Sequence, residues 1–137
     1  FPAVKLSELS EAPHTTKIVV VDSIGLLSVL YAKGKIAYVG GGFGAGIHNT
    51  LEPMAHNKPV IFGPAYSKFP EAVEMLRLKA ARSVNSVQEL IDSIQFYKDS
   101  AHAEDAGKTA NDYMVRNAGA SAKVTKYLLE SIPYSAK

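Results

Sequence analysis

The sequence contains no cysteine among its 137 residues. This absence excludes disulfide bonds, thiolate metal sites and a thiol nucleophile, and it fits a reducing compartment. The net positive charge is also small, at +2, and no stretch of five or six residues is dominated by Lys and Arg. Binding to duplex nucleic acid needs a basic surface. We therefore expect no nucleic-acid partner.

Long apolar runs are missing as well. The most apolar segments, such as residues 18–21, fall far short of the roughly 20 residues that a membrane-spanning helix needs. No signal peptide opens the chain, and it begins at Phe1 without an initiator Met. We therefore expect a soluble piece of a larger protein that acts in the cytoplasm.

The sequence does contain an alternation of strand and helix patterns. Residues 17–22 form a continuous β-branched run, which is typical of a strand covered on both faces. Ser23 can cap the helix that follows, and Gly34 offers it a left-handed stop. Further strands are predicted at residues 36–39, 59–62 and 81–84, and helices at residues 51–57 and 69–78. Another helix is predicted from Ser86 onward, with Leu90, Ile91 and Ile94 on its inner face, and two more helices follow it.

This alternation predicts an α/β fold, a Rossmann-like doubly wound parallel sheet of three to five strands. We expect residues 1–137 to form a single, partial domain whose first 16 residues are loosely ordered.

Half of the ten glycines lie in the seven residues 40–46, directly after one predicted strand and before a predicted helix. Such a loop lets the backbone approach a ligand with its N–H groups, and a helix N-terminus adds about half a positive charge. The pattern favours a phosphate site, and its alternative is a tight turn without a ligand. A P-loop is excluded because Gly46 is followed by Ile47 rather than Lys. A dinucleotide site is disfavoured because no acid stands about 20 residues on, where residues 60–63 lie.

The helix after the loop holds three polar residues near its start. Pro53 fits only the first turn of a helix, which places the start near Asn49 or Thr50. His48, Asn49 and Glu52 then share nearly one face. A carboxylate there can accept both ribose hydroxyls while His48 and Asn49 donate to phosphate. The alternative is that Asn49 caps the helix and Glu52 offsets its dipole, and the pattern alone leaves both open.

A metal site made of His48, Glu52 and His56 is excluded by distance. Eight residues at a rise of about 1.5 Å separate the two histidines by roughly 12 Å, which one zinc ion cannot bridge. No Asp-x-Asp pair, which would hold Mg²⁺ on a diphosphate, occurs in the sequence. We therefore expect no metal.

The segment Gly-Gly-Phe-Gly-Ala-Gly-Ile-His-Asn-Thr-Leu-Glu-Pro, residues 41–53, resembles the 3-deoxy-D-manno-octulosonic acid (Kdo) transferases of lipopolysaccharide biosynthesis, in their C-terminal half. The strand at 59–64, Asp-Ser-Ile-Gly-Leu-Leu at 22–27, Ser-Lys-Phe at 67–69 and Asn-Ala-Gly-Ala-Ser at 117–121 extend the resemblance over about residues 17–130. One departure is Leu-Lys-Ala-Ala at 78–81, where the family usually has glycine.

The resemblance implies the C-terminal domain of a GT-B glycosyltransferase, which holds the donor CMP-Kdo. The family transfers Kdo with inversion and without a metal to a lipid A precursor, at the cytoplasmic side of the bacterial inner membrane. The acceptor, the catalytic base and the membrane contact belong to an N-terminal domain that this chain lacks. The fragment alone is therefore expected to be inactive.

The resemblance also implies a set of donor-binding residues. His48 and Asn49 would stabilise the departing phosphate, Glu52 would bind the ribose, and Ser23 to Gly25 would lie against the base. Lys68 would reach the phosphate or the sugar carboxylate, although a solvated surface lysine is an equal alternative. The substrate-binding set is Ser23, Ile24, Gly25, Gly42, Gly46, Ile47, His48, Asn49, Glu52 and Lys68. Two alternative functions are a GT-B transferase that uses a UDP-sugar and a nucleotide-binding module without chemistry.

Overall fold

The computed structural model describes residues 1–131 and confirms the predicted α/β fold. Its main sheet holds three parallel strands in the order β3-β4-β5, so the strands lie side by side in chain order. Ala37 pairs with Val60, and Val60 pairs with Ala81. The strands are β3 (Ala37–Val39), β4 (Val60–Phe62) and β5 (Ala81–Ser83).

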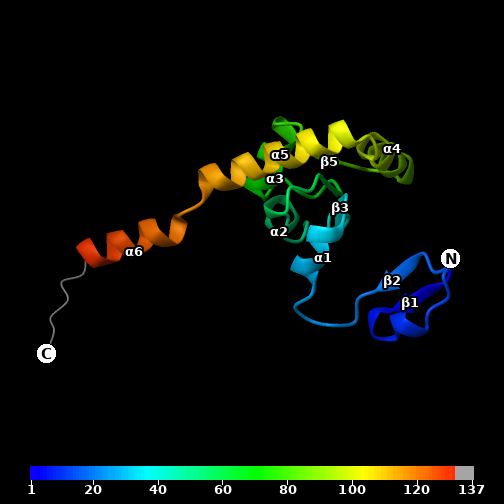
Figure 1. Cartoon of the computed structure of the whole chain (residues 1–137). Helices are drawn as coiled ribbons and strands as arrows, with labels where there is room; N and C mark the ends of the chain where they lie inside the picture. Colours follow the sequence, from blue (N-terminus) through cyan, green and yellow to red (C-terminus); the bar gives the residue numbers. More distant parts are fainter. Residues whose placement is uncertain (132–137) are drawn as a thin grey trace, which may run out of the picture.

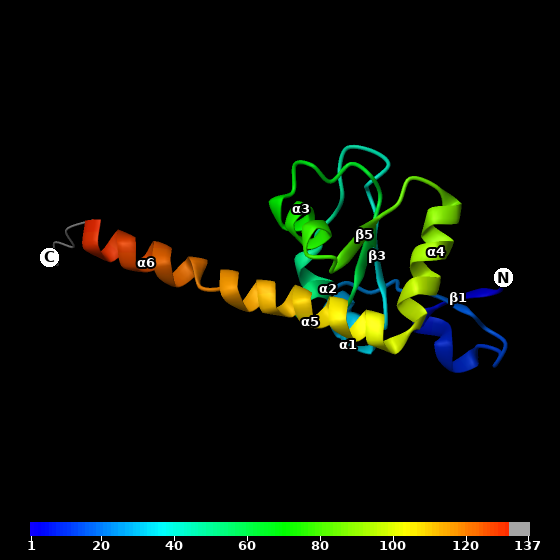
Figure 2. The same ribbon diagram turned by 90° about the horizontal axis from the view of Figure 1, so that it is seen from above.

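Helices lie on both faces of this sheet. Figure 2 shows the strands between α3 on one side and α4 on the other, with α5 running across one end. Both crossovers of the sheet contain a helix, α2 between β3 and β4 and α3 between β4 and β5. The helices are α1 (Leu27–Lys33), α2 (Leu51–Ala55), α3 (Pro70–Arg77), α4 (Val87–Lys98), α5 (Ser100–Asn117) and α6 (Ala120–Ser131).

The two faces of the sheet form two separate apolar cores. Successive side chains of β4 alternate between them, since Val60 and Phe62 belong to one core and Ile61 to the other. Helices α2 and α3 cover the first core, and Tyr97 of α4 packs in the second. Because β4 is buried on both faces, it confirms the prediction that continuous apolar runs are covered strands.

That prediction is wrong for the first apolar run. Residues Ile18–Val20 do form a strand, β2, but it pairs in parallel with β1 (Ala3–Lys5) in a separate two-stranded sheet. Val19 and Val20 remain 42% and 51% exposed. The first 16 residues are also more regular than expected, because a 3-10 helix (Leu6–Glu11) follows β1. Figure 1 shows this small sheet apart from the main one, joined to α1 by an extended connection.

The ends of α1 differ from the predicted ones. The helix begins at Leu27, and Leu26 at its N-cap makes no side-chain capping bond, so Ser23 is not the cap. Gly34 has a φ of −69° and extended backbone rather than the expected left-handed conformation. The helix ends because the chain turns into β3, with the Gly34 amide donating to the Leu30 carbonyl at 2.9 Å.

The Ser86 half of the predicted capping box at the start of α4 is confirmed, whereas the Glu89 carboxylate bonds to the residue before the cap rather than to the Ser86 amide. The Ser86 hydroxyl accepts from the Glu89 amide at 3.2 Å, and the Glu89 carboxylate accepts from the Asn85 amide at 2.7 Å. The buried face of the helix was predicted less well. Ser93 and Tyr97 are its buried residues, whereas Ile91 and Ile94, at 52% and 38% exposure, lie outward.

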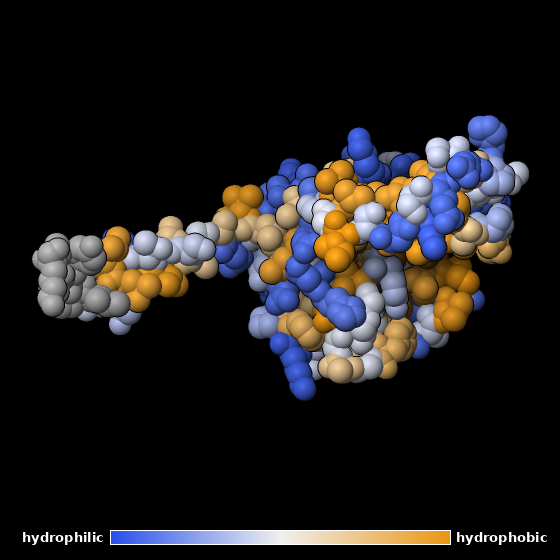
Figure 3. Space-filling model, turned by 90° about the horizontal axis from the view of Figure 1, so that it is seen from below, coloured by the Kyte–Doolittle hydropathy of each residue, from blue (hydrophilic) through white to orange (hydrophobic). Residues whose placement is uncertain are grey.

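The last two helices confirm the two predicted helical stretches. Helix α5 buries Ala106 and Ala110, whereas α6 projects from the body and buries nothing. Figure 3 shows apolar side chains exposed along α6. Val124 and Leu128 of this helix are 57% and 46% exposed. Pro133, the expected stop, lies outside the described residues. Among the described helices, none combines the length and apolarity needed to cross a bilayer.

The backbone is strained just after α3, in the segment where the sequence departs from the glycine pattern noted above. Lys79 has a φ of +59°, the left-handed conformation that favours glycine at the C-terminal end of a helix. We expect Lys79→Gly to raise the free energy of unfolding by about 0.5–1 kcal/mol, because it removes this strain. The control Lys108→Gly, in the interior of α5, should lower it by about 1 kcal/mol. Urea denaturation measures both changes, and destabilisation by Lys79→Gly would contradict this assignment.

Candidate functional site

The glycine-rich loop begins where β3 ends, at the carboxyl edge of the main sheet. Gly41 has a φ of +85°, and its carbonyl accepts from the Gly44 amide at 2.9 Å, which closes a tight turn. The His48 amide donates to the Gly40 carbonyl at 3.0 Å, which closes the loop as a whole. In open α/β sheets ligands bind at this edge, so the fold places the predicted phosphate loop where a ligand site is expected.

A second loop, between β4 and α3, packs directly against the first. A Cβ at Gly42 would lie 2.6 Å from the backbone nitrogen of Gly63, so the two backbones touch where no side chain fits. The Ala65 amide donates to the Gly42 carbonyl at 2.9 Å, and the Ile47 amide donates to the Ala65 carbonyl at 3.3 Å. Ile47 itself is buried. The two loops therefore form one unit.

Lys68 lies at the border of the unit that the two loops form. The ring of the next residue, Phe69, lies against Gly46, because a Cβ at Gly46 would be 2.9 Å from the ring atom Cε2. Lys68 is exposed and precedes α3 directly. The structure thus brings the Lys68 segment next to the glycine loop, as a donor-binding role would require.

Three predicted side chains gather at the end of the loop. The His48 ring lies over Gly41, since a Cβ there would be 3.2 Å from its Cδ2 and Nε2 atoms. The Asn49 amide group donates to Glu52 Oε1 at 3.1 Å, and Asn49 Oδ1 accepts from the Leu51 amide at 2.9 Å. All three side chains are exposed and available to a ligand. Asn49 therefore binds the amide of the first helical residue and the side chain of Glu52, while the N-cap itself is Thr50, whose side chain makes no capping bond.

The helix contributes less to this site than expected. Helix α2 starts at Leu51, close to the predicted point, but has only five residues. Its dipole is correspondingly smaller than that of a long helix. The amides of Ile47 and His48 are also committed to bonds within the two loops. Within residues 1–131, the amides of Gly41, Gly42, Phe43, Ala45 and Gly46 form no bond to another backbone group, so the loop keeps several donors, those of Gly42 and Gly46 among them, that could serve an anion.

The segment predicted to face the nucleobase lies elsewhere in this structure. Ser23, Ile24 and Gly25 belong to the extended connection between β2 and α1 (Figure 1). Ile24 is fully exposed, and a Cβ at Gly25 would meet nothing within 4 Å. No hydrogen bond in the described part of the chain joins these residues to the glycine loop.

Helix α1 brings a residue to the site that sequence analysis did not identify. Burial and then the negative charge of Glu52 raise the pKa of the half-buried Tyr31 phenol. Helical spacing indicates that Tyr31 shares a face of α1 with Ser28, because the two residues are one turn apart. The Ser28 hydroxyl is 3.1 Å from His56 Nε2. Sequence analysis did not identify three residues that contact the glycine loop, Gly63, Ala65 and Phe69. Contact between two loops depends on the order of the strands in the sheet, and the sequence alone does not specify that order.

No metal centre accompanies these groups in residues 1–131, because nowhere do three His, Asp or Glu side chains gather as a ligand set would.

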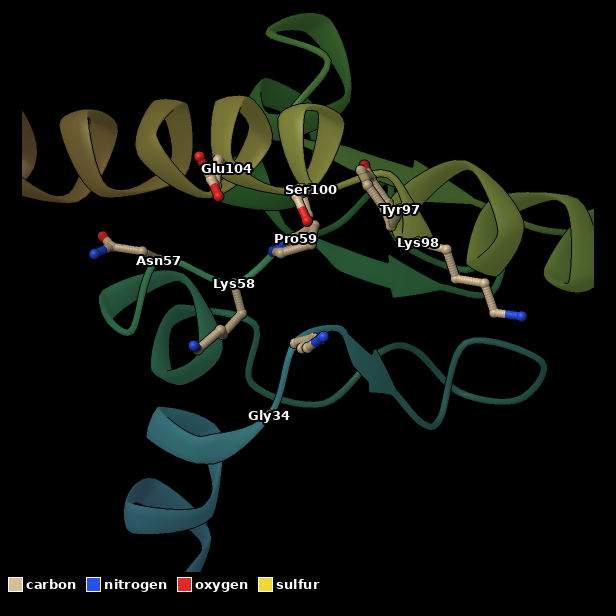
Figure 4. Close-up of a pocket in the computed structure, with 10 residues that line it drawn as sticks. Gly34, Asn57, Lys58, Pro59, Tyr97, Lys98, Ser100 and Glu104 are labelled. Atoms are coloured by element: carbon tan, nitrogen blue, oxygen red, sulfur yellow. The ribbon is translucent and has the colours of Figure 1, made fainter.

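A separate cavity of about 210 Å³ opens at the opposite edge of the sheet (Figure 4). Gly34 and Pro59, which precede β3 and β4, line it together with Tyr97 and Lys98 from the end of α4. Burial raises the pKa of Tyr97 to about 12, with Arg82 opposing, and its buried hydroxyl has no partner in the described residues. We place the candidate site at the glycine loop instead, because that is the carboxyl edge of the strands.

Comparison with known proteins finds relatives among sugar transferases. No profile of a known protein family matches the chain. The chain is 38% identical over 92 residues to a 3-deoxy-D-manno-octulosonic acid transferase of Chlamydia pneumoniae, which covers 65% of the chain and 21% of the relative. It is 36% identical over 106 residues to a bifunctional glycosyltransferase/methyltransferase of Fusobacterium nucleatum, covering 74% of the chain and 17% of the relative. The chain thus spans about a fifth of the length of these relatives.

A solved structure with the same fold is the C-terminal CMP-Kdo binding domain of WaaA from Acinetobacter baumannii. It superimposes with a TM-score of 0.68 at 27% sequence identity, covering 80% of this chain and 59% of that one. The fold prediction, a Rossmann-like domain of the GT-B type, is therefore confirmed.

Proposed function

We propose, from the premise that this chain is similar in sequence and fold to the C-terminal part of the Kdo transferases, that it binds CMP-Kdo as the donor half of an inverting GT-B glycosyltransferase. The single observation that carries the proposal is the group of His48, Asn49 and Glu52 beside the interlocked glycine loop, at the edge where such folds bind ligands. A similar domain is described as CMP-Kdo binding.

The proposed contacts follow from the chemistry of each group. Glu52 accepts the two ribose hydroxyls, since its carboxylate is exposed and held by Asn49. The amides of Gly42 and Gly46, with His48 and Asn49, donate to the phosphate. Lys68 supplies a positive charge for the phosphate or the sugar carboxylate. The Ser23 to Gly25 segment reaches the base only if it moves from its present position.

The proposed reaction is a displacement at the anomeric carbon of Kdo. An acceptor hydroxyl of a lipid A precursor attacks this carbon, and the bond to the phosphate oxygen breaks as CMP departs. Negative charge then grows on a single phosphate. Donors fixed at that phosphate bind the departing CMP more strongly than the bound donor, which lowers the barrier. One phosphate with fixed donors does not require a metal ion, and metal independence is part of the proposal.

The rest of the reaction requires groups that residues 1–131 do not place at the site. We assign the catalytic base, the lipid acceptor site and the membrane contact to an N-terminal domain of the complete transferase. That enzyme would act at the cytoplasmic face of the bacterial inner membrane. Residues 1–137 alone should then bind nucleotide without transferring Kdo.

Another GT-B transferase that uses a UDP-sugar is the second candidate, and the similarity to a bifunctional glycosyltransferase/methyltransferase favours keeping it. The same loop and ribose carboxylate would serve a uridine donor. A nucleotide-binding module without chemistry is the third candidate, and it predicts affinity for nucleotides without transfer even in the complete protein.

Competition between nucleotides separates these candidates. We expect CMP to bind the chain at least about tenfold more tightly than UMP or UDP, which corresponds to about 1.4 kcal/mol. Isothermal titration calorimetry with the three nucleotides measures this order. Tighter binding of UDP than of CMP would contradict a CMP-Kdo site and favour the second candidate.

A further inference from the structure

One aromatic side chain stands at the tip of the glycine loop. Phe43 is a central residue of the turn that the Gly44 amide closes on the Gly41 carbonyl at 2.9 Å. The bond that closes the whole loop, from the His48 amide to the Gly40 carbonyl, lies at the other end of the loop. Phe43 is therefore carried away from the group of polar side chains at the start of α2.

The ring of Phe43 is held against the second loop. A Cβ at Gly63 would lie 2.9 Å from the ring atom Cδ2, so the ring rests on a residue that has no side chain to displace it. Gly63 is buried, whereas Phe43 is 61% exposed. Packing thus fixes one edge of the ring and leaves most of the ring open to solvent. A ring held in this way is a preformed apolar surface, which binds a partner at a low ordering cost.

The position of this ring distinguishes it from an ordinary exposed apolar side chain. Single apolar side chains are common on protein surfaces and need no ligand. Phe43, however, lies at the carboxyl edge of the strands, where α/β sheets bind ligands. It is also the only side chain larger than a methyl group in residues 40–46. A ligand along this loop therefore meets backbone everywhere except at the Phe43 ring.

We propose that the Phe43 ring packs against the Kdo sugar of the donor and so favours CMP-Kdo over CMP. The inference rests on the proposed function. Ribose and Kdo are bonded to different oxygens of one phosphate, so with the ribose at Glu52 the sugar extends past the loop on the other side. Phe43 lies on that side, against the loop that ends at Lys68. The C–H groups of the sugar ring then face the phenyl ring, and the sugar carboxylate faces the lysine.

The test removes the ring with Phe43→Ala in the complete transferase. We expect the KM for CMP-Kdo to rise about five- to tenfold, which corresponds to about 1–1.4 kcal/mol. The inhibition constant of CMP, which carries the ribose and the phosphate but no Kdo, should change less than about twofold. The ratio of the two constants therefore reports contact with the sugar. Phe43→Tyr keeps the ring and should restore the ratio of the unaltered enzyme.

Two further variants control for exposure and for folding. Tyr127→Ala removes a ring that is 68% exposed on α6 and should change neither constant. Phe43→Leu still covers Gly63, so it should fold where Phe43→Ala does not, and it should raise the KM for CMP-Kdo without raising the inhibition constant of CMP. Thermal unfolding of each variant verifies the fold.

The two constants also separate the inference from the proposed function. If they rise equally in the folded Phe43 variants, or if neither changes, the inference is overturned. If the unaltered enzyme does not use CMP-Kdo, or if CMP does not inhibit it, the proposed function itself fails. If both properties are present and the loss of the ring leaves the ratio unchanged, only the inference fails.

Discussion

Replacing Glu52 by Gln is expected to weaken CMP binding about 10- to 150-fold while leaving the fold intact. The carboxylate is proposed to accept both ribose hydroxyls, and hydrogen bonds to a charged group are worth about 1.5–3 kcal/mol. Glutamine keeps the size of the side chain and can still accept from Asn49 through its amide oxygen. Its amide nitrogen, however, cannot accept, so one of the two proposed ribose bonds is lost together with the charge.

Two controls accompany the Glu52 variant in calorimetric titrations. Glu104→Gln makes the same chemical change on α5, beside the cavity at the opposite edge of the sheet, and should leave CMP affinity unchanged. Deoxyribose provides the second control, since dCMP should bind the unaltered chain more weakly than CMP. Equal binding of dCMP and CMP would show that Glu52 serves only as a charge near the start of α2.

Replacing His48 by Ala is expected to lower turnover of the complete transferase about 100-fold, with less than about a threefold change in the dissociation constant of CMP. The imidazole lies over Gly41 in the glycine loop, where negative charge is proposed to grow as CMP departs. Loss of one donor to a developing anion typically costs about 10² to 10³ in kcat. The effect therefore falls on turnover rather than on ground-state affinity.

Steady-state kinetics and CMP titration of the same variant measure this division. His14→Ala, an exposed histidine near the N-terminus, is the matched control and should behave like the unaltered enzyme. A dissociation constant that rises as much as kcat falls would assign His48 to ordinary ground-state binding instead.

The order of elements from β3 to α6 could be predicted from the sequence because local signals agree there. Apolar runs mark β3 and β4, Pro70 opens α3, and the Ser86 capping box opens α4. Each signal depends on neighbours within a few residues, and a stable fold needs such local agreement. The position of the glycine loop follows directly, since it connects one strand to the next helix.

The errors concern packing partners distant in sequence. The β-branched run that forms β2 predicted a strand correctly, but pairing with β1 and exposure to solvent depend on which elements come close in space. Ile91 was placed on the buried face of α4, which instead buries Ser93 and Tyr97, because a periodic pattern does not fix which side faces the sheet.

The same limit applies to the candidate site. The motif located His48, Asn49 and Glu52 together, and the hydrogen bond between Asn49 and Glu52 joins residues only three positions apart, across the start of α2. The approach of Gly63 to Gly42 depends on the fold. Sequence analysis also included Ile47 and His48 in the substrate-binding set, and the structure shows that their backbone amides bond within the two loops.

Titration of the ¹⁵N-labelled chain with CMP, followed residue by residue by NMR, tests whether the glycine loop binds the nucleotide. We expect the largest amide shifts at Gly41 to Asn49, at Glu52 and around Lys68, the segments at and beside the two interlocked loops. Residues at the opposite edge, such as Gly34 and Lys98, should remain unchanged. Shifts concentrated around Gly34 and Lys98, or no shifts at millimolar CMP, would contradict the assignment of nucleotide binding to the glycine loop.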